Sequence, residues 1–246
     1  MKRLIFSILT GLLALLCFAA DVCDRHGCVV RRGADEREVR LIFSADSMFE
    51  GGPHVLDVLA RTGVKGSFFL TGDFIRRPEN EAVIRRIIEQ GHYLGSHGNT
   101  HLQLSEWDDP HTPLVDADSL RRDIRAAKEC LKSIGVESHA GAAALPSFEW
   151  CNAMHAQVFR EEGLTPVNIT PGIETYRDYT TPGMNEYRSS EFMLRQLWEC
   201  EAKGGIAGAV IIFHAGTQDV RTDKLYYHLE EIIEKLKQKG YRLTSF

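Results

Sequence analysis

Short apolar runs alternate with amphipathic stretches along most of the chain, from Val39 to the C-terminus. The apolar runs predict strands, and they cover 39–45, 66–70, 93–95, 140–144, 165–169, 208–213 and 242–244. The stretches between them predict helices at 53–61, 79–90, 119–134, 152–162, 191–202 and 222–239. Glycines that follow helical stretches, as C-cap residues do, are Gly63, Gly91, Gly163 and Gly240. The repeated alternation predicts an α/β protein with a parallel sheet, either open or wound into a barrel.

Size and composition suit one large domain without a nucleic-acid partner. The chain has 246 residues, 43% of them hydrophobic, and single α/β barrels often reach this length. Its formal net charge is −5, so it offers no overall basic field to a phosphate backbone. The composition leaves the oligomeric state open.

The N-terminus has the layout of a secretory signal. A positive start at 1–3 precedes an almost unbroken apolar stretch at 4–18, which is followed by Ala19, Ala20 and the polar Asp21. We predict a signal peptide at 1–20, because the apolar run is shorter than the roughly 20 residues of a spanning helix. The mature protein is then secreted or periplasmic, with no membrane span left; a retained anchor is the alternative.

Cleavage would leave five of the six cysteines, divided between an N-terminal segment at 21–38 and a domain at 39–246. Cys23 and Cys28 are near enough in sequence to close a small loop, and an oxidising compartment permits disulfides. The cysteines lack the CxxC pairs of a structural zinc site. We interpret them as buried small side chains or as one bridge.

Polar side chains follow five of the predicted strands. They are Asp46, the pair His97 and His101, the segment 147–150, Asp178 and His214. In parallel α/β folds, ligands bind at the carboxyl ends of the strands. The sequence therefore predicts that these residues converge on one site.

Three of them form a candidate metal site. His97 and His101 are four residues apart, a spacing that directs two imidazoles to one centre in helical or turn geometry. Asp46 adds a carboxylate, and such a set leaves a position open for water, as catalytic sites do. We expect one divalent ion, with zinc as the leading candidate. Taken alone, each residue also suits a surface, core or turn role.

The chain resembles the polysaccharide deacetylases, the chitooligosaccharide-deacetylase-like members of carbohydrate esterase family 4. The stretch 55–72 is similar to the family's first helix and second strand, and 91–101 to its histidine motif. The run 211–214 is similar to the late strand that ends in a catalytic histidine. The resemblance covers 39–246 and implies a distorted (β/α) barrel of about seven parallel strands. It also implies that Asp46, His97 and His101 bind the metal.

Two residues depart from the family pattern. The family usually has consecutive aspartates, of which the first is the general base, but here Ala45 precedes Asp46. Ala144 takes the place of the arginine that orients this base. Because a general base contributes about 10²–10⁴-fold, its loss slows hydrolysis by metal-bound water without forbidding it. Glu149 is a candidate replacement; a surface or capping role is its alternative.

The remaining candidates would handle the substrate. His214 would protonate the leaving group, although a histidine at a strand end is often bonded in the core. Aromatic side chains that would stack on sugar faces are Phe148, Trp150 and Tyr179, for which a core role is the alternative. Asp178 and Arg188 are expected to contact the substrate.

The leading hypothesis is a metal-dependent hydrolase that removes N- or O-acetyl groups from an oligo- or polysaccharide. Ala45 and Ala144 replace the family's base and the arginine that orients it. Their presence favours an alternative, a carbohydrate-binding protein on the same scaffold that does not hydrolyse. A hydrolase of small C–N substrates is a third possibility, because fold alone determines little of function.

Overall fold

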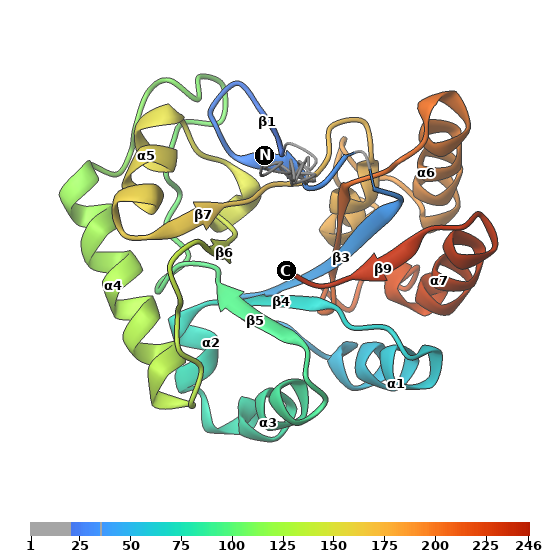
Figure 1. The fold of residues 1–246 in the computed structure, drawn as a ribbon, viewed down its shortest axis with the longest axis horizontal. Coiled ribbons are helices and arrows are strands. Elements are labelled where there is room, and N and C mark those ends of the chain that lie inside the picture. Colours follow the sequence, from blue (N-terminus) through green and yellow to red (C-terminus); the bar gives the residue numbers. More distant parts are fainter. Residues whose placement is uncertain (1–20, 35) are drawn as a thin grey trace, which may run out of the picture.

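A mostly parallel, curled sheet forms the centre of the computed structural model, which describes residues 21–34 and 36–246. The predicted signal peptide at 1–20 lies outside this part. The strands are β1 (Val22–Cys23), β2 (Val29–Arg31), β3 (Glu38–Ala45), β4 (Ser67–Leu70), β5 (Tyr93–Ser96), β6 (Ala142–Ala144), β7 (Leu164–Pro166), β8 (Ala209–His214) and β9 (Arg242–Thr244). Their order is β1-β2-β8-β3-β4-β5-β6-β7, and β9 also pairs with β3. Figure 1 shows the part of this sheet from β3 to β7. Strands β3 to β9 all pair in parallel, which confirms the predicted seven-stranded distorted barrel.

Strand β3 is the central element, because it pairs with β4, β8 and β9. Its residues are buried from Val39 to Ala45, as expected of a strand covered on both faces. Phe43 faces the core between the sheet and the helices. Ile42 faces the opposite side and packs with Phe69 and Ile212 in a separate interior cluster.

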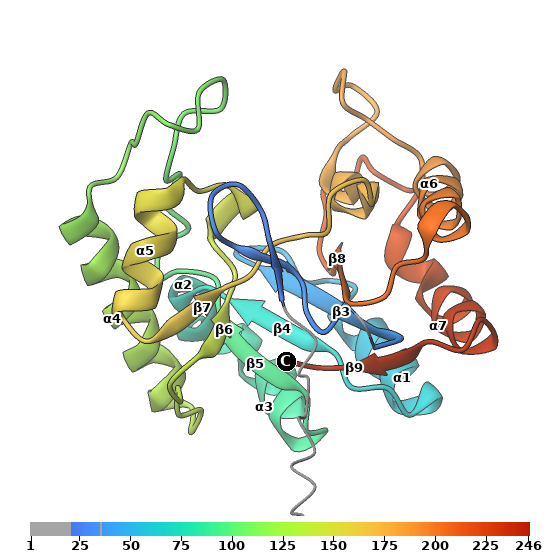
Figure 2. The same ribbon diagram turned by 45° about the horizontal axis from the view of Figure 1, so that its top comes forward.

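Helices pack around the outside of the curled sheet (Figure 2). The α-helices are α1 (Gly52–Thr62), α2 (Gly72–Arg76), α3 (Glu81–Glu89), α4 (Ala117–Ser133), α5 (Ala153–Glu161), α6 (Ser190–Gly204) and α7 (Leu229–Gln238). Short 3₁₀ turns are η1 (Pro78–Asn80), η2 (Ser147–Glu149), η3 (Glu174–Tyr179) and η4 (Leu225–His228). Asp116 caps α4 by accepting the Ser119 N–H, and Gly63 ends α1 at a φ of 67°. None of the helices in the described ranges is both long and apolar enough to cross a bilayer.

The structure adds one helix and shifts two element boundaries by more than two residues. Helix α2 was not predicted; Thr71 starts it by accepting the Phe74 N–H. Helix α7 begins at Leu229 rather than at residue 222, because the preceding residues form loop and the turn η4. Strand β7 ends at Pro166 rather than at residue 169, because the next residues turn toward β2, where the Asn168 N–H donates to the Val29 carbonyl.

The N-terminal segment belongs to the sheet instead of leading up to it. Strand β2 pairs antiparallel with β8 through Arg31 and Ala209. Val29 also bridges Val167, just after β7, and its carbonyl accepts the Asn168 N–H at 2.8 Å. Strand β2 thus links the two ends of the parallel array.

Candidate metal and hydrolase site

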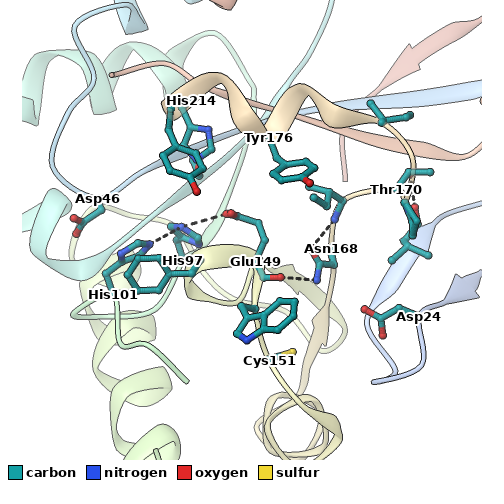
Figure 3. Close-up of a pocket in the computed structure, with 18 of the residues that line it drawn as sticks. Asp24, Asp46, His97, His101, Glu149, Cys151, Asn168, Thr170, Tyr176 and His214 are labelled. Atoms are coloured by element: carbon teal, nitrogen blue, oxygen red, sulfur yellow. Dashed lines mark hydrogen bonds and ion pairs between the residues drawn. The ribbon is translucent and has the colours of Figure 1, made fainter. Parts of the chain in front are cut away.

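A cavity of about 920 Å³ lies at the carboxyl ends of the strands. Asp46, His97 and His101 stand together at one end of it, beside Glu149 and His214, and Asp24 stands at the other end (Figure 3). All of these residues except Asp24 come from the carboxyl ends of β3, β5, β6 and β8, as expected for a parallel sheet. The structure therefore brings together the five residues for which the sequence predicted metal binding or catalysis.

The two histidines meet through their Nε2 atoms. His97 follows β5 directly and is buried, and its Nε2 lies 3.1 Å from that of His101. The Nδ1 of His97 donates to the Leu145 carbonyl at 3.0 Å, so a neutral His97 has its lone pair on Nε2. Burial, and then the neighbouring His101, hold the pKa of His97 well below its usual value. Burial lowers the pKa of His101 as well. Both side chains are thus suited to the neutral state that metal binding requires.

The donor set fits a divalent ion on chemical grounds. Two nitrogens bound to one tetrahedral zinc at about 2.0–2.1 Å lie about 3.3 Å apart, close to the observed 3.1 Å. The hydrogen bond from His97 to Leu145 is the outer contact that typically orients a ligating imidazole. Asp46 is half-buried at the same end of the cavity, and its Oδ1 is 3.5 Å from the Thr71 hydroxyl. Over the described ranges, however, no three His, Cys, Asp or Glu side chains are grouped closely enough to enclose an ion.

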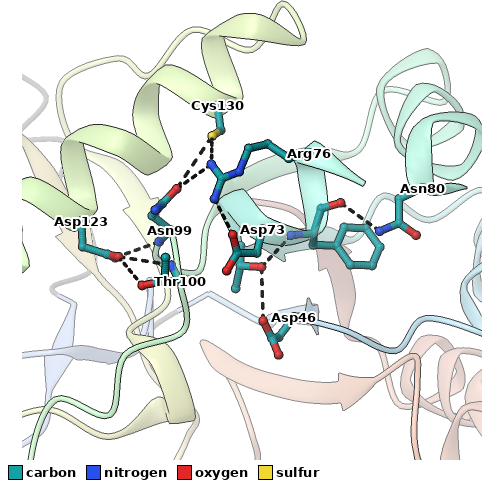
Figure 4. A network of polar contacts seen from close by, with 10 residues as sticks. Asp46, Asp73, Arg76, Asn80, Asn99, Thr100, Asp123 and Cys130 are labelled. Atoms are coloured by element: carbon teal, nitrogen blue, oxygen red, sulfur yellow. Dashed lines mark hydrogen bonds and ion pairs between the residues drawn. The ribbon is translucent and has the colours of Figure 1, made fainter. Parts of the chain in front are cut away.

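A polar network holds the loop between the two histidines (Figure 4). Asp123 of α4 is buried and accepts the Asn99 N–H at 2.8 Å and the Thr100 N–H at 3.2 Å. It also accepts the Thr100 hydroxyl at 3.0 Å. This support matters because His101 has a φ of 52°, which is uncommon for a residue other than glycine.

Glu149 presents a buried carboxylate oxygen to the cavity. Its Oε1 is shielded from solvent, has no hydrogen-bond partner among the described residues and lies 3.8 Å from Nε2 of His97. Burial raises the pKa of this carboxyl to about 7. Phe148 and Glu149 have φ values of 60° and 53°, so a strained turn directs the side chain inward. Asn168 supports the turn by donating to the Glu149 carbonyl at 2.9 Å.

His214 and Asp178 form a buried pair. Asp178 Oδ1 accepts from His214 Nδ1 at 2.6 Å, and its Oδ2 accepts the His214 backbone N–H at 2.9 Å. Burial alone would lower the pKa of His214, but the charge and hydrogen bond of Asp178 outweigh it and raise that pKa. Asp178 is only 1% exposed and does not line the cavity. It is placed to orient the histidine and not, as predicted from the sequence, to contact the substrate.

Aromatic side chains form much of the cavity wall. Phe148 packs on His101 with ring centres 4.1 Å apart, and Trp150 donates to the Glu106 carbonyl. Trp107 is 53% exposed and packs edge-on against Phe148. Aromatic residues along the cavity are Trp107, Phe148, Trp150, Tyr176 and Tyr179. Trp107 and Tyr176 were not predicted from the sequence, because neither directly follows a predicted strand.

Arg188 is not part of the site. Its guanidinium donates to the Tyr187 carbonyl at 2.7 Å and lies over the Phe192 ring, outside the cavity lining. Ala45 lines the cavity, whereas Ala144 is fully buried in β6 and is not part of the lining. Neither alanine can supply an acid, a base or a charge.

A family model described as polysaccharide deacetylase matches residues 32–167. The putative polysaccharide deacetylase YheN of Bacillus subtilis is 27% identical over 203 residues, which are 78% of this chain and 63% of that protein. The chitooligosaccharide deacetylase of Rhizobium leguminosarum bv. trifolii is 24% identical, over 87% of this chain and 92% of that protein. The solved structure of BA3943, a CE4 family pseudoenzyme from Bacillus anthracis, superposes with a TM-score of 0.70 at 17% identity. That match covers 89% of this chain and 67% of the other.

Proposed function

The chain belongs to the polysaccharide deacetylase family, and we propose that it is a metal-dependent hydrolase that removes acetyl groups from a carbohydrate. The observation that carries the proposal is the meeting of His97 and His101 at 3.1 Å, with Asp46, Glu149 and His214 around the same cavity. The substrate class is an acetylated oligo- or polysaccharide, with the acetyl group on nitrogen or oxygen.

Asp46, His97 and His101 would hold one divalent ion, and zinc suits two imidazoles and a carboxylate. Such an ion supplies Lewis acidity toward the acetyl carbonyl and lowers the pKa of water. The two neutral imidazoles and the His97–Leu145 hydrogen bond prepare the site for a cation. The Oε1 of Glu149, 3.8 Å from His97, would add negative charge at the same place once this carboxyl, whose pKa is about 7, is deprotonated.

Glu149 would act as the general base in place of the missing aspartate. Its carboxylate comes from the loop after β6, where the family carries its arginine motif, whereas the usual base comes from the end of β3. A proton removed from the attacking water can be accepted by Oε1, which has no other hydrogen-bond partner in the described chain. The rigid turn around Phe148 and Asn168 keeps this oxygen turned toward the histidines.

His214 would act as the general acid. It lines the cavity, and Asp178 binds its Nδ1, so Nε2 is the nitrogen left free to donate a proton. The proton would pass to the departing amine or alcohol as the carbon–nitrogen or carbon–oxygen bond breaks. Asp178 holds the ring in place and stabilises its protonated form.

The aromatic wall would bind the sugar. Trp107 and Phe148 are 53% and 38% exposed, so they offer apolar faces against which the C–H side of a pyranose can pack. We further propose that residues 1–20 direct export, so that the mature chain meets extracellular or periplasmic glycans. In this assignment, 21–38 precede a catalytic domain at 39–246.

The two alanines favour one second candidate, a carbohydrate-binding protein that does not hydrolyse. Ala45 and Ala144 stand where the family usually has a base and its arginine partner. If Glu149 does not replace them, the cavity would bind glycan without cleaving it. Glycan binding without acetate release would identify this case.

Acetate release by the zinc-loaded chain from acetylated chitooligosaccharide, peptidoglycan and xylan tests the proposal. We expect release from at least one of them, and its loss in His101→Ala with the fold retained, as judged by circular dichroism. A fully active His101→Ala variant would show that the site has been misassigned.

A further inference from the structure

Two cysteines that the proposed chemistry does not use face each other behind the Glu149 turn. The Sγ atoms of Cys28 and Cys151 lie 3.2 Å apart, although the residues are 123 positions apart in the chain. Both are buried, with 0% and 3% exposure. Since an S–S bond is about 2.0 Å long, the two sulfur atoms are about 1.2 Å from bonding distance.

Strands β1 and β2 pair antiparallel and form an N-terminal hairpin, whose turn places Cys28 at this position. Asp24 accepts the N–H groups of His26 and Cys28, each at 2.9 Å, and its own N–H donates to the Cys28 carbonyl. The turn leads straight into β2, which bridges the two ends of the parallel array at Val29 and Arg31. Cys28 is therefore held at the point where the hairpin joins the rest of the fold.

The other cysteines in the described part of the chain are less suited to this pairing. Cys23 is exposed on β1. Cys130 is contacted by the Arg76 guanidinium at 2.7 Å, and the Cys200 thiol donates to the Gly172 carbonyl at 2.9 Å. A bridge between Cys23 and Cys28, considered from the sequence, would need Cys28 to turn away from its buried partner.

We propose that Cys28 and Cys151 form a disulfide that staples the N-terminal hairpin to the turn carrying Glu149. Each thiol loses a proton and the pair loses two electrons to a small-molecule or enzyme disulfide, which is reduced to two thiols. The bond joins the two sulfur atoms within a buried apolar cluster in which both cysteines pack beside Leu104 and Phe159. Because both thiols are buried in the folded chain, we expect the bond to form during folding.

The staple would act on the most strained part of the site. Cys151 follows the turn in which Phe148 and Glu149 both have positive φ values, and such backbone persists only where its surroundings hold it. Asn168 already ties this turn to β2, because it donates to both the Glu149 and the Val29 carbonyls. A covalent link beside that contact would restrict the turn and the hairpin together. The inference does not depend on whether the chain hydrolyses acetyl groups.

Thiol trapping and peptide mapping test the proposal directly. The purified chain is unfolded, refolded with oxidised glutathione, alkylated and digested without reduction. We expect a peptide pair linked through Cys28 and Cys151, while the Cys200 peptide is alkylated. Alkylated Cys28 and Cys151, or a link from Cys28 to another cysteine, would overturn the proposal.

Thermal unfolding with and without dithiothreitol measures the effect of the staple. Reduction should lower the melting temperature of the refolded chain by about 5–15 °C, because the closed loop is long. Cys28→Ala and Cys151→Ala should each abolish this response to reductant, whereas Cys200→Ala should keep it. An identical melting temperature with and without reductant in the unsubstituted chain would contradict the proposal.

Discussion

Glu149→Gln should make the metal-free protein more stable and the enzyme less active. The substitution keeps the shape of the side chain and removes its charge. The pKa of the Glu149 carboxyl is raised from 4.5 to about 7, because the side chain is buried. Within 21–34 and 36–246, its Oε1 has no hydrogen-bond partner to offset this burial. The folded state therefore disfavours the charged carboxylate, and glutamine removes that cost.

The size of the effect follows from linkage between protonation and folding. Below pH 4.5 the carboxyl is protonated in both states and costs nothing; the cost then grows until about pH 7 and stays constant above it. A pKa rise from 4.5 to about 7 corresponds to about 3 kcal/mol of the free energy of unfolding. For a chain of this length, a gain of this size should raise the melting temperature of the variant at pH 8 by about 6–12 °C relative to the unsubstituted chain. At pH 5 about a quarter of this cost remains, so roughly three quarters of the difference should disappear.

Scanning calorimetry of the chelator-stripped protein at pH 5 and pH 8 is the assay. Glu89→Gln, at an exposed glutamate on α3, is the matched control and should show no such pH-dependent gain. Acetate release by the zinc-loaded Glu149→Gln variant should fall by about 10²–10⁴-fold, the usual contribution of a general base. Equal melting temperatures at pH 8, or unchanged acetate release, would refute this account of Glu149.

Three further substitutions test other parts of the site. Asp178→Asn should lower kcat by about 10²-fold or more and move the alkaline limb of the pH–rate profile to lower pH. The reason is that His214 must be protonated to act and loses the carboxylate that raises its pKa. An alkaline limb that does not move would show that His214 is not the general acid. Asp123→Ala should weaken zinc binding about 10–100-fold in a calorimetric titration by freeing the histidine loop, while Glu129→Ala on the same helix should not. Trp107→Ala should raise KM about 2–12-fold with kcat nearly unchanged, as expected for the loss of one stacking face, and an unchanged KM would exclude it from sugar binding.

The parallel strands could be predicted because each is a short apolar run buried by its neighbours. Strand β3 is the clearest case, with seven consecutive buried residues from Val39 to Ala45. Strands β1 and β2 have two and three residues, too few for a periodic pattern to stand out. Helix α2 has five residues and is defined by its Thr71 cap more than by an apolar face.

The convergence of the candidate residues followed from the rule that parallel strands end at one edge. Their individual roles did not follow from it, because roles depend on contacts between distant segments. Asp178 and His214 are 36 positions apart, and only the folded chain shows that one holds the other. The inward direction of Glu149 depends on a φ of 53°, which no residue pattern predicts. The contact between Cys28 and Cys151, across 123 positions, is of the same kind.

Acetate release during zinc titration tests the central claim most directly. The chelator-stripped chain and its Asp46→Ala variant would each receive zinc in steps, with an acetylated oligosaccharide present in excess. The account predicts that release by the unsubstituted chain rises to a plateau near one equivalent of zinc, and that Asp46→Ala stays near background. Release that is independent of zinc, or a folded and zinc-loaded chain that frees no acetate from any sugar offered, would contradict it.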